Sequence, residues 1–291
     1  MFERAAVIDI GSNSVRMLLK LGQERRQMLV TTRLGQGVDG RMLQSEPVRR
    51  TIAAIGQFVE TARQNGVEEI YAFATSAVRD AQNREKLTEP VKLLYGIEID
   101  VLPGEKEAEL AYLGAAGGEF AGVMDIGGAS TELVAGSGSV EKAVSLQTGA
   151  VRLREAFGVD RAAAQKHLRA LFLPQRETFA AYESAPFFGI GGTITTLSAM
   201  EQGIEKYDEK RVDRFALDYA CVEKWADKLW DTPVEQRIFP GLSEPRREII
   251  AHGVTILQVF MECFARDRII VSTGDNLSGY LTSLAAGKNR T

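Results

Sequence analysis

The sequence VIDIGSNS, from Val7 to Ser14, decides the fold, because it recurs as VMDIGGAS from Val123 to Ser130. Each copy begins as a short apolar strand, ends that strand with Asp-x-Gly, passes through a turn of small residues and enters a second strand. Glycine in such a turn permits positive φ and lets backbone N–H groups come close to a ligand. An internal repeat of this kind indicates a duplicated structural unit.

The segments that follow the two copies are also parallel. The sequence pattern of each half predicts a third strand and then alternating helices and strands. The resulting order is β-β-β-α-β-α-β-α, with extra helices in the second half. In the first half, the apolar spacing predicts one helix from about Pro47 to Asn65 and another over Ala77–Leu87. We therefore expect an α/β protein of two lobes, each with a mixed sheet flanked by helices.

The predicted lobes are residues 1–118 and 119–276, which meet at a hinge near Gly117–Gly118. A C-terminal helix over about 277–291 could pack back on the first lobe. Because the hairpins of a duplicated fold face one another, we expect the active site in the cleft between the lobes. The alternative is that both Asp-x-Gly segments are simply tight hairpin turns.

The composition is that of an ordinary folded protein, with 291 residues, 45% hydrophobic and 25% charged, and a net charge of −4 argues against a general nucleic-acid binder. The longest apolar stretch, Ile249–Phe264, falls short of the ~20 residues that span a bilayer, and the N-terminus has no signal-peptide pattern. Cys221 and Cys263 have no metal-ligand spacing, so neither a disulfide framework nor a zinc site is expected. We expect a cytoplasmic protein without membrane or nucleic-acid partners, and a homodimer is left open.

Three glycine-rich turns suit phosphate, because backbone N–H groups and hydroxyls can converge on its oxygens. The third turn, GIGGT at Gly189–Thr193, runs from a strand into a helix whose dipole favours an anion, although the same glycines could serve packing alone. The predicted phosphate ligands in the three turns are Gly11, Ser12, Asn13, Ser14, Gly127, Gly128, Ala129, Ser130, Thr131, Gly191, Gly192 and Thr193.

Asp9 and Asp125 end the strands that lead into the first two turns. A carboxylate beside a bound phosphate would be repelled unless a hard cation lay between them, so Mg²⁺ is implied, with Mn²⁺ as the alternative metal. The other possibility for either aspartate is a hydrogen bond within its own turn.

Acidic residues also gather at the start of a predicted helix, where Glu105, Glu107 and Glu109 follow Pro103-Gly104. Carboxylates in a first helical turn stabilise the helix by ~0.3–1 kcal/mol and need no further role. The residues alone therefore single out none of the three.

Taken together, these segments resemble the exopolyphosphatase/guanosine pentaphosphate phosphohydrolase (Ppx/GppA) family. The resemblance implies two ribonuclease-H-like lobes of the actin-like ATPase superfamily. It also implies Mg²⁺-dependent release of terminal orthophosphate from inorganic polyphosphate, or of the 5′ γ-phosphate from guanosine pentaphosphate. Long members carry a helical C-terminal region, so this chain looks like a short two-domain form. The segments that carry the resemblance are AVIDIGSNSVRMLL, ATSAVRDAQN, PGEKEAELAYLGA, GVMDIGGASTEL, QTGAVRLRE, GIGGTITTL and EIIAHG.

The resemblance also implies roles for single residues. It makes Glu107 the catalytic glutamate, Asp125 and Glu132 the acids that serve Mg²⁺, and Arg79 and Arg152 basic residues that bind phosphate. The sequence departs from the family pattern at Pro103, Lys106 and Ala129, and the usual arginine of a C-terminal segment has no counterpart at Leu277 or Ser278. Two rival functions stay open: an ATP-dependent small-molecule kinase of the same superfamily, and a non-catalytic sensor of polyphosphate or guanosine alarmones.

Overall fold

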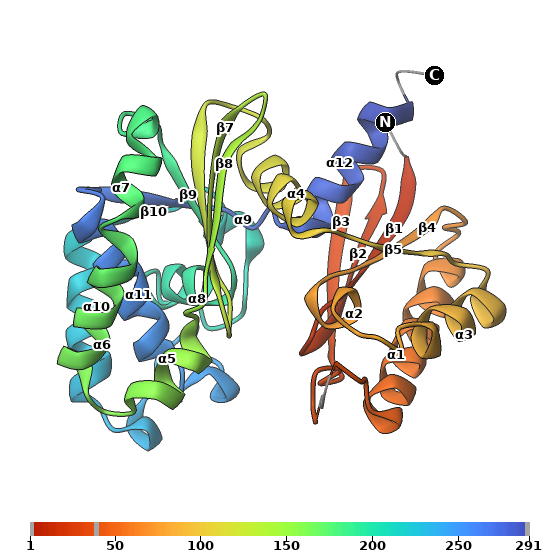
Figure 1. Ribbon diagram of the computed structural model, residues 1–291, viewed down its shortest axis with the longest axis horizontal. Coiled ribbons are helices and arrows are strands. Elements are labelled where there is room, and N and C mark those ends of the chain that lie inside the picture. Colours follow the sequence, from red (N-terminus) through yellow and green to blue (C-terminus); the bar gives the residue numbers. More distant parts are fainter. Residues whose placement is uncertain (1–2, 38–40, 289–291) are drawn as a thin grey trace. The chain divides into compact units, whose positions relative to one another are not determined.

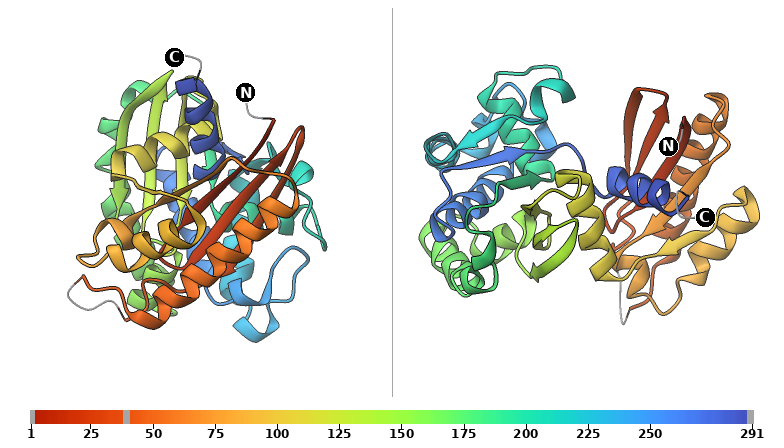
Figure 2. Two further views of the ribbon diagram at one scale, coloured as in Figure 1. Left: turned by 90° about the vertical axis from the view of Figure 1, so that its right-hand side faces the viewer. Right: turned by 90° about the horizontal axis from the view of Figure 1, so that it is seen from above.

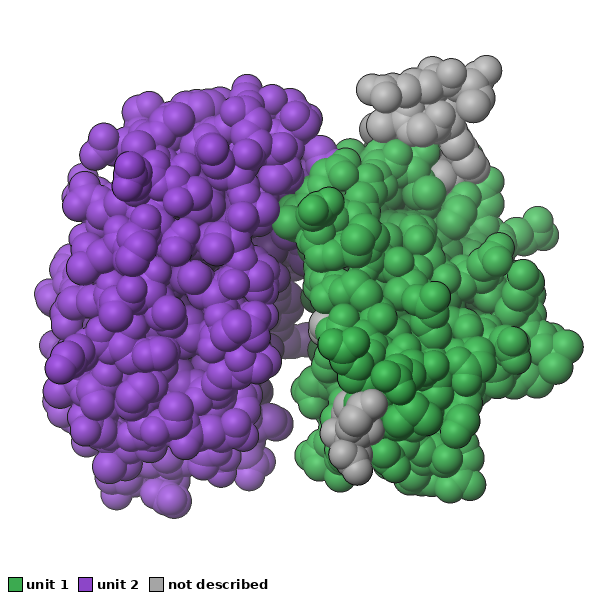
Figure 3. Space-filling view, in the orientation of Figure 1, with its two compact units in different colours: residues 1–110, 276–291 green, residues 111–275 purple. Residues whose placement is uncertain are grey.

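The computed structural model describes residues 3–37 and 41–288, and the chain divides into two compact units (Figures 1 and 3). Unit 1 comprises residues 1–110 and 276–291, and unit 2 comprises residues 111–275. The boundary lies inside the helix α4, Gly104–Ala116, and not at the Gly117–Gly118 pair. Each unit has a mixed sheet with helices, which confirms the predicted α/β architecture.

The sheet of unit 1 has the strand order β3-β2-β1-β4-β5. The first three strands form an antiparallel meander, and β4 and β5 run parallel to β1. The strands are β1 Arg4–Ile10, β2 Ser14–Leu21, β3 Glu24–Thr31, β4 Ile70–Ala74 and β5 Ile99–Val101. Besides α4, the helices are α1 Ser45–Gln64, α2 Ser76–Arg79, α3 Glu85–Tyr95 and α12 Asn276–Lys288.

Side chains on both faces of this sheet are buried, as the nearly continuous apolar run of β1 requires. Ile8 packs with Phe58 of α1 on one face, and Val7 packs with Tyr280 of α12 on the other. Figure 2 shows α12 alongside the first strands, where it contacts β1 and β2. The C-terminal helix is therefore part of the core of unit 1.

Unit 2 repeats this arrangement in a six-stranded sheet with the order β10-β11-β9-β6-β7-β8. Strands β6, β7 and β8 form the equivalent antiparallel meander, and β9 lies parallel to β6 as β4 lies to β1. The edge strand β10 is an addition that the sequence did not predict. The strands are β6 Ala121–Ile126, β7 Thr131–Ser137, β8 Ser139–Leu146, β9 Phe187–Ile190, β10 Ala216–Asp218 and β11 Arg268–Val271.

Among the helices of unit 2, α11 is buried along almost its whole length. The helices of this unit are α5 Ala150–Phe157, α6 Arg161–Phe172, α7 Gln175–Thr178, α8 Gly192–Glu201, α9 Glu209–Val212, α10 Tyr219–Asp231 and α11 Ile250–Cys263, with short 3₁₀ helices at Ala180–Tyr182, Val234–Gln236 and Glu244–Arg246. Within the described part of the chain, no helix is both long and apolar enough to cross a membrane.

The helix predicted over Ala77–Leu87 is wrong, because residues 80–84 separate α2 from α3. The buried side chain of Asn83 explains the interruption. It accepts a hydrogen bond from the Leu43 N–H at 2.8 Å and donates one to the Leu43 carbonyl at 3.0 Å. Since these bonds join residues far apart in the sequence, helical periodicity could not reveal them.

His252 on α11 makes the stability of the protein sensitive to pH. Its Nε2 lies 2.7 Å from the Gly158 carbonyl oxygen and donates to it, while the buried Nδ1 has no partner among the described residues. Burial lowers the pKa of His252 below its ordinary value, and the charges of Arg237 and Arg154 lower it further, against the opposing effect of the Gly158 bond. The unfolded chain therefore binds this proton more tightly than the native protein does, and stability falls as the pH drops below about 6.5.

We expect the free energy of unfolding, measured by urea titration, to decrease between pH 7 and 5 in the wild-type protein. His252→Gln should flatten this dependence, whereas His167→Gln, the matched change at the other histidine, should keep it. Equal pH dependence in wild type and His252→Gln would show that other groups are responsible.

Candidate active site

The first two glycine turns have the same backbone geometry. The Gly11 N–H donates to the Ser14 carbonyl at 3.0 Å, and the Gly127 N–H donates to the Ser130 carbonyl at 3.0 Å. A Cβ added at either glycine would lie 3.1 Å from that serine oxygen, which is tighter than an ordinary contact. In both turns the two central residues are exposed and the two outer ones are half-buried. The sequence repeat is thus a repeat in hydrogen bonding and exposure as well.

The chain that follows the third strand of each unit binds the carbonyl side of the turn. In unit 1, the Gly35 N–H donates to the Ser12 carbonyl at 2.8 Å. In unit 2, the N–H groups of Val151 and Arg152 donate to the Gly128 carbonyl at 2.9 and 3.1 Å. Gly128 corresponds to Ser12 in the repeat, so the two units anchor their turns at the same carbonyl.

These anchors also orient the donors of the turns. In a planar trans peptide, the carbonyl of one residue and the N–H of the next point in opposite directions, and the described residues contain no cis peptide. The N–H groups of Asn13 and Ala129 therefore point away from the anchoring segments, which is the arrangement that an anion needs. The Thr131 hydroxyl is used differently, because its side chain is buried and it donates to the Thr148 carbonyl at 2.6 Å.

The third turn lies beside the second at the carboxyl end of two parallel strands. Asp125 of β6 pairs with Ile190 of β9, and Gly191 follows with a φ of +91°. A Cβ at Gly191 would lie 2.6 Å from Asp125 Oδ1, so only glycine allows the aspartate to come this close. The carboxyl ends of parallel strands are where α/β proteins bind ligands. The next residues, Gly192 and Thr193, begin α8, and the Thr193 side chain is buried.

Arg246 is a residue of this site that the sequence analysis missed. A Cβ added at Gly192 would lie 2.0 Å from both Arg246 Nη atoms, so the guanidinium lies directly against the first residue of α8. Burial lowers the pKa of Arg246, and within residues 3–37 and 41–288 its side chain has no acidic or hydrogen-bonding partner. A cation beside the positive end of a helix dipole is unfavourable, and a bound anion would stabilise both.

The sequence does contain a signal for this arginine. The family resemblance placed the usual arginine near Leu277 and Ser278, where it has no counterpart, while the pair Arg246-Arg247 stands shortly before the apolar α11. Only the close approach to Gly192 distinguishes Arg246, and that contact joins two residues far apart in the chain.

Two carboxylates face each other beside the second turn. Asp125 and Glu132 are directly opposite in the antiparallel pair β6–β7, so their side chains lie on the same face of the sheet. Glu132 Oε1 accepts a hydrogen bond from Ser145 Oγ at 2.8 Å. Like charges placed opposite one another on a sheet are destabilising, and a cation between them would remove that cost.

The equivalent positions of unit 1 carry opposite charges. Asp9 and Arg16 are paired in the antiparallel strands β1–β2, and Asp9 is 5% exposed. Arg16 Nε donates to Asp9 Oδ2 at 3.1 Å, and Arg16 Nη2 forms an ion pair with the same oxygen. The residue opposite the aspartate is therefore a cation, Arg16, in unit 1 and a second carboxylate, Glu132, in unit 2.

The number of carboxylates beside the second turn fits Mg²⁺, although it would not suffice for a metal bound by protein side chains alone. No group of three or more His, Cys, Asp or Glu side chains in the described residues is arranged to hold a metal ion by itself. Mg²⁺ commonly takes only one or two protein carboxylates, with water and substrate phosphate oxygens as its other ligands. Asp125 and Glu132 are enough for such a site.

Glu107 is held at the start of α4 by an arginine from α2. Arg79 Nη1 lies 3.2 Å from Glu107 Oε2 and 3.1 Å from the Leu102 carbonyl oxygen. Both side chains of this ion pair are half-buried. Of the other two acids predicted in this helix, Glu109 pairs with Lys106 at 2.9 Å and Glu105 is exposed.

The two arginines predicted to bind phosphate have protein partners. Arg79 contacts Glu107 and also Asp80, with Nε 3.4 Å from Asp80 Oδ1. Arg152 Nη1 donates to the side chain of Gln147 at 2.9 Å. Their role in phosphate binding stays a prediction.

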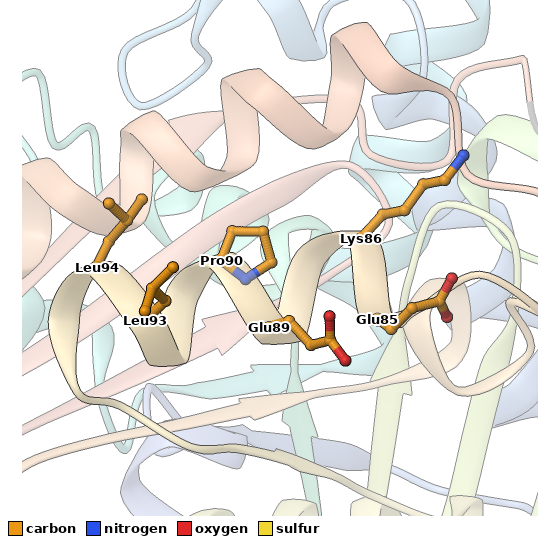
Figure 4. Close-up of a pocket in the computed structure, with 6 residues that line it drawn as sticks. All are labelled: Glu85, Lys86, Glu89, Pro90, Leu93 and Leu94. Atoms are coloured by element: carbon orange, nitrogen blue, oxygen red, sulfur yellow. The ribbon is translucent and has the colours of Figure 1, made fainter.

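A hollow of about 600 Å³ on the surface of α3 is separate from the candidate active site (Figure 4). Its lining comes from this one helix and includes none of the predicted site residues. The residues are Glu85, Lys86, Glu89, Pro90, Leu93 and Leu94. With two carboxylates and one lysine, it offers little to bind a polyanion.

Comparisons with known proteins agree with this geometry. The model of the Ppx/GppA phosphatase family matches residues 7–286. Exopolyphosphatase 2 of Mycobacterium tuberculosis is 32% identical over 97% of this chain and 98% of its own length. The guanosine-5′-triphosphate,3′-diphosphate pyrophosphatase of Aliivibrio fischeri is 29% identical over 92% of this chain, and the chain spans about half the length of this and of another curated relative.

A solved structure supports the same assignment. The Ppx/GppA family member of Aquifex aeolicus superposes with a TM-score of 0.85 and 31% sequence identity, over 99% of both chains. Because the family model covers nearly the whole sequence and a structure of equal extent shares the fold, the chain belongs to the Ppx/GppA phosphatase family.

Proposed function

We propose that this chain is an exopolyphosphatase that releases terminal orthophosphate from inorganic polyphosphate, with guanosine pentaphosphate as a second substrate. The observation that carries the proposal is the repeated turn with unequal charges, Asp125 and Glu132 in unit 2 against Asp9 and Arg16 in unit 1. A relative of nearly the same length is named an exopolyphosphatase, whereas the pyrophosphatase relative is much longer, which favours polyphosphate as the main substrate.

In this proposal the protein positions phosphate and water. The N–H groups of Asn13 and Ala129 bind phosphate oxygens, and Arg246 neutralises phosphate charge at the start of α8. Glu107 orients the attacking water, with its carboxylate fixed by Arg79. Mg²⁺ bound at Asp125 and Glu132 would stabilise negative charge on the transferred phosphoryl group. Because such transition states are loose, positioning and electrostatics supply most of the catalysis.

The assay that tests this proposal is orthophosphate release from long polyphosphate, short polyphosphate, guanosine pentaphosphate and ATP, measured side by side with and without Mg²⁺. We expect metal-dependent release from polyphosphate. ATP turnover that requires an added acceptor would indicate a kinase instead. Tight binding without release would indicate a sensor.

Arg246→Ala is expected to raise KM for polyphosphate by about ten- to a hundredfold, because a charge-assisted hydrogen bond contributes ~1.5–3 kcal/mol. Arg246→Lys should recover part of the loss by keeping the charge. Arg154→Ala, which removes a half-buried arginine of α5 that pairs with Glu248, is the charge-matched control. Equal KM values in the Arg246→Ala and Arg154→Ala variants would remove Arg246 from the site.

A further inference from the structure

The segment Thr32–Gln36, which we name the Arg33 loop, wraps around the first glycine turn. The N–H groups of Thr32 and Arg33 both donate to the Asn13 carbonyl, at 3.0 and 2.8 Å. Together with the bond from Gly35 to Ser12, these contacts fix the loop to the turn at three points. The loop is therefore part of the same rigid structure as the predicted phosphate donors.

Arg33 has an unusual backbone conformation within this loop. Its φ is +51°, in the left-handed region, which costs a residue with a Cβ about 1–2 kcal/mol. Residues held in this way are concentrated at ligand-binding sites, where the surrounding structure fixes them. Here the fixing contacts are the bond from Arg33 to the turn and the bond from Gln36 N–H to the Arg33 carbonyl at 2.9 Å.

The side chain of Arg33 is exposed, and among the described residues it has no hydrogen bond or ion pair. Two acceptors of its own loop are used by another residue. Arg50 of α1 donates from Nε to the Thr32 carbonyl at 3.1 Å and from Nη2 to Gln36 Oε1 at 3.0 Å. Arg33 thus carries an exposed guanidinium without a partner among the described residues, on a loop whose backbone is bonded to the turn.

The second turn also has an arginine whose backbone is hydrogen-bonded to it, although at a different position of the repeat. In unit 2, Arg152 follows the third strand, and its backbone N–H binds the carbonyl of Gly128 in the second turn. In unit 1, Arg33 follows the third strand, and its backbone N–H binds the carbonyl of Asn13 in the first turn. Each turn therefore has one arginine whose backbone is hydrogen-bonded to it.

We propose that Arg33 is a phosphate-binding residue of unit 1, which contacts polyphosphate through its guanidinium next to the first turn. The planar guanidinium can donate two parallel hydrogen bonds to phosphate oxygens. This inference rests on the proposed function and deepens it, because it adds a substrate contact that is separate from the metal and from Glu107.

Glycine substitution separates binding from stability. Arg33→Gly removes the side chain and accepts positive φ, so the melting temperature should stay unchanged or rise by a few degrees. In a Glu107→Gln background, which prevents turnover, the Kd for tripolyphosphate measured by calorimetry should rise about tenfold. Arg33→Lys, which keeps the charge, should retain more of the affinity.

Arg41→Gly is the matched control. Arg41 also has positive φ, at +67°, and is exposed, but its backbone carbonyl accepts a hydrogen bond from the Gln82 N–H at 2.9 Å and lies outside the turn contacts. The Arg41→Gly variant should, like Arg33→Gly, have an unchanged or slightly higher melting temperature, but it should keep its affinity for tripolyphosphate. Equal Kd values for Arg33→Gly and its Glu107→Gln parent would overturn the inference alone. A parent that binds no tripolyphosphate would overturn the proposed function, and the inference with it.

Discussion

Glu107→Gln should lower kcat for polyphosphate by about 10²–10⁴-fold, the usual range for a positioned acid–base group. The substitution keeps the shape of the side chain and removes the negative charge that orients the attacking water. Substrate binding should hardly change, because the turns and Arg246 supply the phosphate contacts. The measurement is steady-state orthophosphate release, with kcat and KM determined separately.

The same helix supplies two controls. Glu105→Gln changes an exposed acid, and Glu109→Gln changes an acid that pairs with Lys106. Both should stay near wild type, because neither carboxylate has the contact with Arg79 that fixes Glu107. If all three variants lose activity equally, Glu107 is only a helix-terminus charge and another group must orient the water.

The repeat explains why so much of the fold was predictable from the sequence. In VIDIGSNS and VMDIGGAS, the strand and the turn are determined by residues that are close together in the sequence. The structure accordingly has the same hydrogen bond at Gly11 and at Gly127. Helix α1 follows the predicted range closely, because its apolar spacing lies within the element, and α4 begins where the cluster of acidic residues predicted a helix start.

Features that depend on distant partners were not predictable. Asn83 ends a helical pattern because it binds the backbone of Leu43, and Arg246 is distinguished only by its contact with Gly192. The strain at Arg33 likewise depends on its bond to Asn13. In each case the sequence shows the residue type, and only the tertiary structure shows the partner.

Asp9 is the most instructive site residue, because the sequence alone treats it as the equal of Asp125. Both aspartates end equivalent strands, but the residue opposite Asp9 is Arg16 and the residue opposite Asp125 is Glu132. Arg16 already neutralises Asp9, so a divalent cation there would have to compete with a guanidinium. We therefore expect the metal to depend on the carboxylates of unit 2.

Asp125→Asn should raise the Mg²⁺ concentration for half-maximal activity by at least about tenfold, equivalent to ~1.4 kcal/mol, and excess Mg²⁺ should partly restore the rate. Glu132→Gln should behave in the same direction. Asp9→Asn is the matched comparison, since it makes the same chemical change at the equivalent position of the repeat, and it should leave the Mg²⁺ dependence unchanged. The measurement is kcat/KM against Mg²⁺ concentration for the three variants. A shift in Asp9→Asn as large as that in Asp125→Asn would mean that both aspartates serve the metal, and that the ion pair with Arg16 opens when substrate binds.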